Sequence, residues 1–235
     1  MSEKHALGAK PHRKDDRDYA YPVQLAGPIQ DTERWWAMHG PDFRIDQGGE
    51  GTCVGHSFTN ELLASPRPHT SYPNFATVEQ AHQFARKAYL EASGDPTYQA
   101  GMYVRTMMDY AVSHNYASAY YRCVDVAATN HALLTTGPVM FASPWYGSMW
   151  AEDRELFQAT GGELYLRVDP ATKLVGYHCY LLTGIDLDPD VGPPFVRMEN
   201  SWGPGWMKNG TIRITVDDLA ILYDGDSYTL TEKRF

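Results

Sequence analysis

The stretch Gln47–Ser57, with the sequence QGGEGTCVGHS, places a glutamine six residues before a cysteine, Cys53. Apolar residues at helical spacing follow this cysteine, so a helix is expected over residues 52–64 with Cys53 in its first turn. Thr52 is a suitable N-cap, because its hydroxyl can accept an early backbone N–H. A helix N-terminus favours negative charge and lowers the pKa of a thiol placed there. The stretch therefore predicts a reactive cysteine rather than a buried structural one.

Two side chains far downstream complete a set suited to nucleophilic chemistry. His178 lies in an aromatic and apolar run, which predicts a strand over residues 177–185. Asn200 follows a short predicted strand over residues 195–199, and its side-chain oxygen can fix the tautomer of an imidazole. A neighbouring imidazole activates a thiol for attack on a carbonyl. The order Cys53, His178, Asn200 thus predicts a thiol hydrolase.

Gln47 is expected to have a separate function in the same reaction. Attack on a carbonyl creates an oxyanion, which preorganised hydrogen-bond donors stabilise. The side-chain amide of Gln47 and the backbone N–H of Cys53 are expected to supply two such donors. The alternative is a loop glutamine that serves only the glycine-rich turn, and the spacing to Cys53 favours the functional interpretation.

These residues resemble those of the papain-family cysteine proteases, and of bacterial or phage members without a long pro-region. In that family a glutamine precedes a cysteine that opens a helix, and a histidine on a strand and an Asn-Ser-Trp-Gly segment follow. Gln47, Cys53 and His178 match this pattern, and the segment Asn200–Trp206, NSWGPGW, is the most specific match. The histidine and asparagine lie 125 and 147 residues beyond the cysteine, close to the family spacing.

The resemblance implies an α+β fold with two lobes and the active cleft between them. Residues 1–45 are expected to form an N-terminal extension, and residues 46–235 a papain-like peptidase domain. A helical lobe over about 46–118 carries the cysteine, and an antiparallel β-barrel lobe over about 119–235 carries the histidine and asparagine.

Hydrophobic patterns along the chain support this class, because helical patterns come first and strand patterns later. Helices are expected near 32–38, over 52–64, 78–92 and 102–113, and as short segments over 130–136 and 149–158. Strands are expected over 120–126, 139–142, 163–168, 177–185, 195–199, 211–216 and 228–230.

Four substrate-binding positions are expected: the resemblance implies Gly101 and Ala142, whereas Tyr177 and Trp202, which is also a candidate core aromatic, are chosen for their places next to His178 and Asn200 in the motifs. Gly101, in the segment QAGMY, matches the glycine-bearing stretch whose backbone pairs with the substrate. Ala142 follows a segment like the one that precedes a wall of the S2 pocket. Tyr177, directly before the catalytic histidine, is expected to narrow or polarise the cleft, and Trp202 to shield the histidine–asparagine hydrogen bond. The implied partner is a peptide or protein substrate.

The sequence departs from the family pattern near the cysteine. Glu50 stands where extracellular members carry a disulfide cysteine, which fits a reducing compartment. Val54 replaces the usual aromatic residue, and His56 is expected to pack or to form a local hydrogen bond. No typical inhibitory pro-region is recognised in residues 1–45, and we predict that this segment occludes the cleft and restrains activity.

Composition sets further limits. The 235 residues carry 20 basic and 29 acidic side chains, a net charge of −9, which argues against nucleic acid or an anionic membrane as the main partner. The three cysteines, Cys53, Cys123 and Cys179, are widely separated, and no spaced Cys/His set indicates zinc or another cofactor. The polar N-terminus lacks a signal-peptide core, and no apolar run reaches the length of a membrane span, so a cytoplasmic location is expected.

Three alternatives to an endopeptidase remain open at this point. The same thiol and imidazole can transfer an acyl group to an amine or deamidate a glutamine. A binding protein with an inert cleft is a second alternative, although it has no need of Gln47 or Trp202. A zinc hydrolase built on Cys53, His56 and His178 is a remote third, because their spacing fits no common zinc site.

Overall fold

The structure is a computed structural model that describes residues 5–15, 18–22, 31–38, 44–64, 75–190 and 192–231. The helices are α1 (Cys53–Leu63), α2 (Val78–Ser93), α3 (Val104–Ser113), α4 (Val126–Thr135), α5 (Arg154–Ala159), α6 (Val216–Leu222) and the 3-10 helix η1 (Gly147–Trp150). The strands are β1 (Glu33–Trp35), β2 (Tyr120–Arg122), β3 (Val139–Tyr146), β4 (Leu174–Asp186), β5 (Phe195–Glu199), β6 (Thr211–Thr215) and β7 (Ser227–Leu230).

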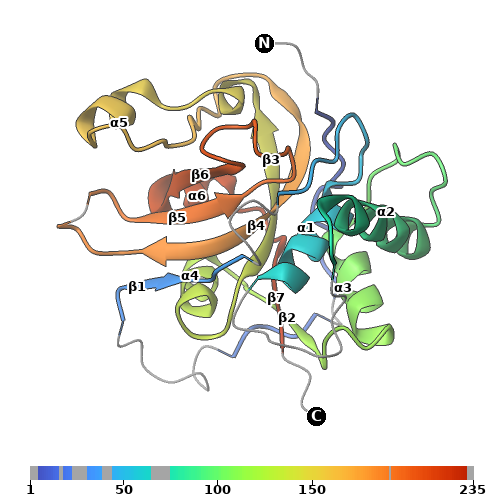
Figure 1. Ribbon diagram of the computed structural model, residues 1–235. Helices are drawn as coiled ribbons and strands as arrows, with labels where there is room; N and C mark the ends of the chain where they lie inside the picture. The colour runs from blue at the N-terminus through green and yellow to red at the C-terminus, as the bar shows by residue number, and fades with distance from the viewer. Residues whose placement is uncertain are drawn as a thin grey trace.

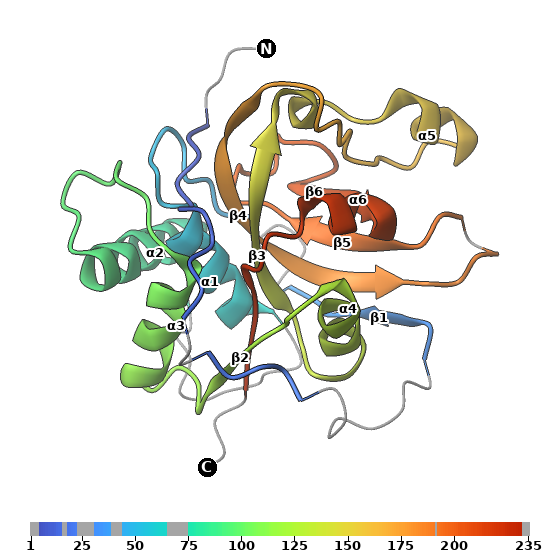
Figure 2. The same cartoon turned by 180° about the vertical axis from the view of Figure 1, so that it is seen from behind.

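Helices and strands are segregated in space as they are in the sequence. Figure 1 shows α1, α2 and α3 together on one side and the antiparallel sheet on the other. The sheet has the order β2-β7-β3-β4-β5-β6, and β1 pairs with β4 outside that path. Figure 2 shows α4 and α6 beside the strands, away from α1–α3. The expected α+β class is confirmed.

Strand β4 forms the boundary between two hydrophobic cores. Alternate side chains of a strand point to opposite faces of its sheet. Tyr180 and Leu182 belong to the core on the α4 and α6 side, whereas Cys179 and Leu181 belong to the core built around α1 and α3. This alternation fixes α1, and with it Cys53, against the middle of β4.

Helix α1 is buried along its whole length, and one glycine allows this packing. A Cβ atom on Gly55 would lie 2.5 Å from the carbonyl oxygen of Ala85 and 2.9 Å from Cβ of Tyr89 in α2. Thr52 does precede the helix, but its hydroxyl makes no capping hydrogen bond, so that expectation was wrong. Instead, its carbonyl oxygen accepts a 3.0 Å hydrogen bond from Nδ1 of His56, consistent with the local role expected for this histidine.

Several other expectations are corrected by tertiary contacts. The helix expected near 32–38 is wrong, because residues 33–35 form β1 and pair with Gly184–Asp186 of β4. The strand expected over 163–168 is reduced to isolated bridges, one of them from Leu166 to Glu152. The strand expected over 120–126 ends at Arg122, because Asp125 caps α4 by accepting from the amide of Ala128.

Other boundaries differ in length only. Strand β3 continues beyond residue 142 to Tyr146, and β4 begins at Leu174 rather than at residue 177. The helix expected over 149–158 is divided into η1 and α5. Within the described ranges, none of the helices has the length and apolar character needed to cross a membrane.

Candidate active site

Cys53 is the first residue of α1, as the sequence predicts, and is fully buried against β4. Burial raises the pKa of the Cys53 thiol to about 11. The backbone of Cys179 and that of Gly8 favour the thiolate and oppose this shift. In this structure the thiol is therefore protonated at neutral pH.

His178 and Asn200 are in direct contact. Nε2 of His178 lies 2.8 Å from Oδ1 of Asn200, so the ring donates its Nε2–H to this oxygen. The contact fixes the tautomer and leaves Nδ1 as the basic nitrogen. This Nδ1 has no hydrogen-bond partner among the described residues. Burial lowers the pKa of His178 to about 4, although the hydrogen bond to Asn200 opposes that shift.

Tryptophans enclose this hydrogen bond. The Trp202 ring stacks on His178 at a centroid distance of 4.6 Å, and Trp145 meets the same imidazole edge-on at 5.1 Å. Trp150 stacks on Trp202 at 5.1 Å, and Trp206 packs edge-on at 5.4 Å. Trp202 thus covers one face of the imidazole. Trp145 and Trp150 were missed, because strand and helix patterns do not reveal which aromatic side chains converge.

Gln47 is buried, and each end of its amide has partners. Its Oε1 accepts a 2.6 Å hydrogen bond from the Ser201 hydroxyl. Its Nε2 donates to the carbonyl oxygens of Glu50, at 2.8 Å, and Ala6, at 3.0 Å. The amide N–H expected to serve an oxyanion is therefore directed at a main-chain carbonyl from the N-terminus.

That carbonyl belongs to the N-terminal segment, residues 5–12, which lies over the site. Figures 1 and 2 show this part of the chain passing between α1–α3 and strands β3 and β4. Its backbone is paired on both sides, because the amide of Ala9 donates to Tyr177 O at 3.2 Å and an isolated parallel bridge joins Ala9 to Met102. The amide of Ala6 also donates to Gly48 O at 3.2 Å.

The backbone of the N-terminal segment passes close to the surrounding backbone, because the residues at the points of contact are glycines. A Cβ atom on Gly8 would lie 2.0 Å from the carbonyl oxygen of Gly51, and one on Gly101 would lie 2.4 Å from the carbonyl oxygen of Gly8. Gly101 also has a φ of +64°, a conformation that glycine adopts without strain. The ring of His5 stacks on Trp202 at 5.1 Å. The expected position of the segment across the site is thus seen for residues 5–12.

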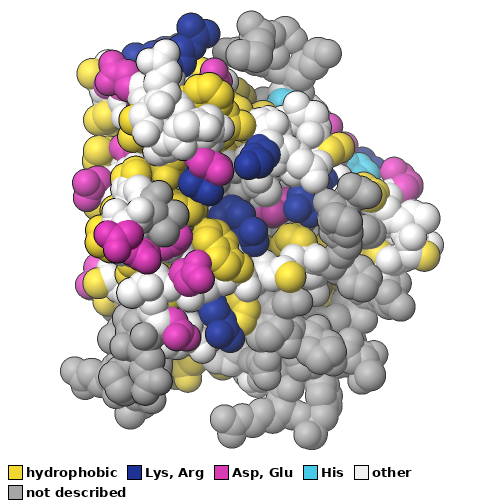
Figure 3. Space-filling view, turned by 60° about the vertical axis from the view of Figure 1, so that its left-hand side comes forward, with side chains coloured by type: hydrophobic (Ala, Val, Ile, Leu, Met, Phe, Trp, Pro, Cys, Tyr) yellow, Lys and Arg dark blue, Asp and Glu magenta, His cyan; other side chains and the backbone are white. Residues whose placement is uncertain are grey.

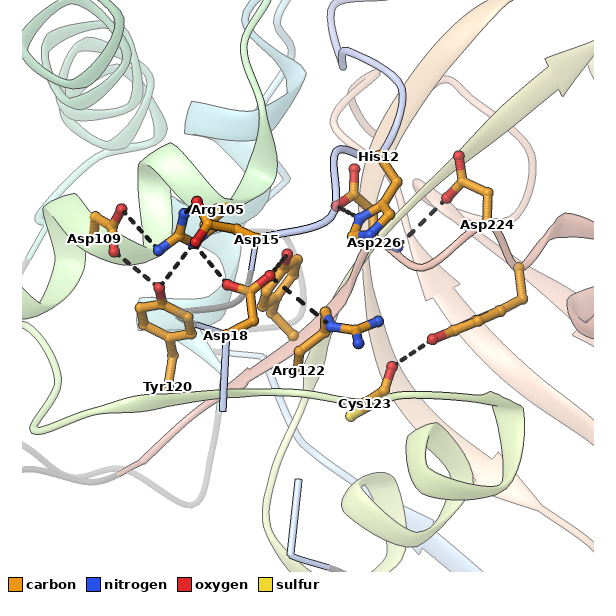
Figure 4. Close-up of polar contacts among 12 residues, drawn as sticks. His12, Asp15, Asp18, Arg105, Asp109, Tyr120, Arg122, Cys123, Asp224 and Asp226 are labelled. Atoms are coloured by element: carbon orange, nitrogen blue, oxygen red, sulfur yellow. Dashed lines mark hydrogen bonds and ion pairs between the residues drawn. The ribbon is translucent and has the colours of Figure 1, made fainter. Parts of the chain in front are cut away.

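Ionic contacts hold the chain just beyond this crossing (Figure 4). Nδ1 of His12 lies 2.9 Å from a carboxylate oxygen of Asp226, and this hydrogen bond raises the pKa of His12. The Arg105 guanidinium contacts the carboxylates of Asp15 and Asp18, the latter at 2.6 Å from Nε. These pairs connect the start of the chain to both the helical side and the sheet.

Three of the four expected substrate-binding residues contact the N-terminal segment, namely Gly101, Tyr177 and Trp202. The fourth, Ala142, is buried in the same hydrophobic core as Cys53. Sequence reasoning predicted that residues 1–45 occlude the cleft, but it did not identify which part of this segment crosses the site or which backbone groups pair with it.

The His56 ring also contacts a second histidine, with 3.0 Å between its Nε2 and Nδ1 of His82. No group of three or more His, Cys, Asp or Glu side chains suited to a metal ion occurs in the part of the chain that the structure describes.

The helices on one side, the antiparallel sheet on the other and the site between them define the papain-like fold. The structure is similar to xylellain, a cysteine protease from Xylella fastidiosa, with a TM-score of 0.66 and 16% identity over 100% of this chain and 99% of that one. It is similar to procathepsin L 3 of Tenebrio molitor larval midgut, with a TM-score of 0.60 and 16% identity over 95% of this chain and 75% of that one. It is also similar to bromelain from Ananas comosus, solved with the E64 inhibitor, with a TM-score of 0.61 and 14% identity over 86% of this chain and 100% of that one. The sequence itself matches no protein-family model and no curated protein.

Proposed function

We propose that this protein is a cysteine endopeptidase in which Cys53 is the nucleophile, His178 the acid and base, and Gln47 an oxyanion donor. The observation that carries the proposal is the 2.8 Å contact between His178 and Asn200 beneath Trp202, on a strand against which the helix that begins at Cys53 is packed. It supplies the oriented base that a thiol nucleophile needs.

The reaction follows from this arrangement. Nδ1 of His178 takes the proton of the Cys53 thiol, and the sulfur attacks the scissile carbonyl carbon. The Gln47 side-chain amide and the Cys53 backbone N–H stabilise the oxyanion. The imidazolium then protonates the leaving amine, which departs as the carbonyl re-forms in a thioester. His178 next deprotonates a water molecule, which attacks the thioester, and the sulfur leaves and regains its proton.

The path of the N-terminal segment through the site is evidence that the substrate is a polypeptide. Residues 6–10 show that the site accommodates an extended main chain, since amides and carbonyls of Gly48, Met102 and Tyr177 pair with it. These backbone groups become free to pair with a substrate strand when the segment leaves. Asn200 acts as a positioning residue, because it touches the imidazole and not the substrate.

The proposed activity is restrained while the N-terminal segment lies over the site. A thiol pKa of about 11 and an imidazole pKa of about 4 keep both groups neutral at pH 7. Burial is the main cause of both shifts, so we expect removal of the segment to hydrate the pair and bring the two values closer together.

Labelling with E-64, an epoxide that alkylates papain-like thiols, tests the proposal. Intact mass and peptide mapping are expected to locate one adduct on Cys53, absent in His178→Ala and retained in the matched Cys123→Ala variant. The Gly8→Ala variant, whose added methyl displaces the N-terminal segment, serves as the opened form. Absence of an adduct on Cys53 in both the wild-type and opened forms would contradict the proposal.

Peptide cleavage is the second readout. Hydrolysis of a mixed peptide library by the opened form is expected to stop in Cys53→Ala, and unchanged cleavage in that variant would refute the assignment. Product masses separate hydrolysis from acyl transfer to an amine, because the latter adds the mass of the acceptor and releases no free carboxylate at the cut.

A further inference from the structure

A hollow on the β5–β6 pair shares no lining residue with the proposed peptidase site. Its volume is about 530 Å³, within the range of small-molecule sites. Figure 3 shows dark-blue side chains of Lys and Arg gathered around this hollow between hydrophobic ones. The proposed peptidase reaction makes no use of it.

The charge of the hollow is opposite to that of the chain. Four basic side chains, those of Arg44, Arg197, Lys208 and Arg213, line it together with one acid, Glu163. Including the buried Glu199, which pairs with Arg44 at 2.7 Å, basic groups exceed acidic ones by two among the described residues of the lining. The whole chain has a net charge of −9, so this concentration of positive charge is local. Such a field attracts small anions.

Strand register brings two of these cations together. Arg197 of β5 lies directly opposite Arg213 of β6, and like charges in that arrangement destabilise a sheet. Glu163 contacts Arg213 at 3.1 Å and Lys208 at 3.5 Å. Arg197 instead donates to the hydroxyl of Thr183 and to main-chain oxygens, and among the described residues it has no carboxylate partner at ion-pair distance. The arginine pair therefore suits an anion supplied from outside.

Aromatic rings hold the two guanidinium groups and form the apolar wall beside them. The Arg213 guanidinium lies 4.2 Å from the ring centroid of Phe195, and that of Arg197 lies 5.2 Å from the ring of Trp35. The Trp35 and Phe195 rings are themselves 5.8 Å apart. Stacking orients a guanidinium, and Nη1 of Arg197 takes no part in the hydrogen bonds to Thr183 and Trp36. Trp35 remains 39% exposed, so part of this wall is open to a ligand.

We propose that this hollow binds a small dianion, a phosphate monoester or a dicarboxylate, whose apolar ring lies against Trp35 and Phe195. The two excess positive charges match a dianion. The remaining guanidinium N–H groups match its oxygens, since phosphate and carboxylate both accept charge-assisted hydrogen bonds from arginine. The site is separate from the proposed peptidase reaction and does not depend on it.

Isothermal titration of the full chain with three probes tests the proposal. Phenyl phosphate and phthalate represent the two sources of the dianion, inorganic phosphate lacks the ring, and benzyl alcohol serves as the neutral control. We expect saturable one-to-one binding of at least one ring-bearing dianion, weaker at high salt. Binding of only one of the two identifies the group that the site prefers.

Variants assign the binding to this hollow. Arg213→Gln and the exposed Lys208→Gln are each expected to weaken binding about tenfold or more. Lys87→Gln, on α2 and away from the hollow, is the matched control and is expected to leave the affinity unchanged. Trp35→Leu is expected to weaken the binding of phenyl phosphate more than that of inorganic phosphate. The proposal would be overturned if neither ring-bearing dianion showed saturable binding. It would also be overturned if Arg213→Gln and Lys208→Gln both bound with the affinity of the wild type.

Discussion

The hydroxyl of Ser201 donates a 2.6 Å hydrogen bond to Oε1 of Gln47, so the residue after Asn200 orients the side chain six positions before Cys53. The contact determines which end of the amide faces the site, because with Oε1 held by Ser201 the Nε2 group must point toward Ala6. The backbone reinforces it, since the amide of Gln47 donates to Ser201 O at 2.8 Å. Gln47, the proposed oxyanion donor, is thus hydrogen-bonded to the residue that directly follows Asn200, which orients the base.

Gln47→Ala is expected to lower kcat for peptide hydrolysis by about 10²–10³, because it removes one oxyanion donor and leaves Cys53 and His178 in place. Ser201→Ala is expected to have a smaller effect, about tenfold, since Gln47 remains but is less well oriented. Steady-state kinetics in the Gly8→Ala background measures both. Gln83→Ala, an exposed glutamine on α2, is the matched control. A Gln47→Ala enzyme with normal kcat would disprove the oxyanion role.

Gly8→Ala is expected to open the site in the full-length chain. The new methyl would lie 2.0 Å from the carbonyl oxygen of Gly51, a contact that forces the backbone of the N-terminal segment and that of Gly51 apart. We expect E-64 to label Cys53 at least about tenfold faster, because labelling then no longer waits for a rarely populated open form. Gly205→Ala is the control, since a Cβ there meets no atom within 4 Å. Equal labelling rates in wild type and Gly8→Ala would argue against restraint by this segment.

Alkylation by iodoacetamide is expected to show the effect of the N-terminal segment on the thiol itself. Burial raises the pKa of Cys53 to about 11, so in the wild type its alkylation should be slow at pH 7 and rise up to about pH 11. In Gly8→Ala the rate should reach its plateau at lower pH, because the hydrated thiolate is no longer disfavoured. Peptide mapping across a pH series separates Cys53 from the buried Cys123, whose profile should not change. Identical Cys53 profiles in both proteins would contradict the explanation by burial.

Local chemistry explains what could be predicted from the sequence. The helix that begins at Cys53 and the strand that contains His178 could be predicted, because the spacing of apolar residues within each segment indicates its secondary structure. The motif order placed Cys53 at the start of a helix, His178 on a strand and Asn200 directly after another strand, where the structure has them. Thr52 shows the limit of such reasoning, because a good capping residue made no capping bond once its surroundings were buried.

Tertiary pairing explains what could not be predicted. Strand β1 is extended because β4 offers an unpaired edge there, a partner about 150 residues further along the chain. The path of residues 5–12 depends in the same way on Gly51, Met102 and Tyr177, which no local pattern connects to the N-terminus. The opposed arginines of β5 and β6 became visible only when the register was known.

Gly55→Ala is expected to destabilise the fold by about 1–3 kcal/mol, the usual cost of overpacking a core. The added methyl would meet the Ala85 carbonyl oxygen at 2.5 Å and force α2 away from α1. Urea unfolding measures the change in free energy. Gly49→Ala, where a Cβ meets no atom within 4 Å, is the control. A Gly55→Ala protein as stable as wild type would mean that the two helices separate without cost.

Glu199→Gln is expected to change how stability depends on pH. Burial raises the pKa of Glu199 to about 7, and the charges of Arg44 and Arg197 oppose this shift. A carboxyl group with a raised folded-state pKa contributes most stability below its unfolded pKa and loses that contribution as pH rises to about 7. The wild type should therefore lose stability between about pH 4.5 and 7 by an amount that Glu199→Gln does not, on the order of a few kcal/mol. Urea unfolding at pH 5 and pH 7.5 measures the difference, and Glu79→Gln, on the exposed surface of α2, is the matched control. Parallel pH profiles for wild type and Glu199→Gln would show that Arg44 holds the carboxylate ionised throughout, which the 2.7 Å ion pair alone would favour.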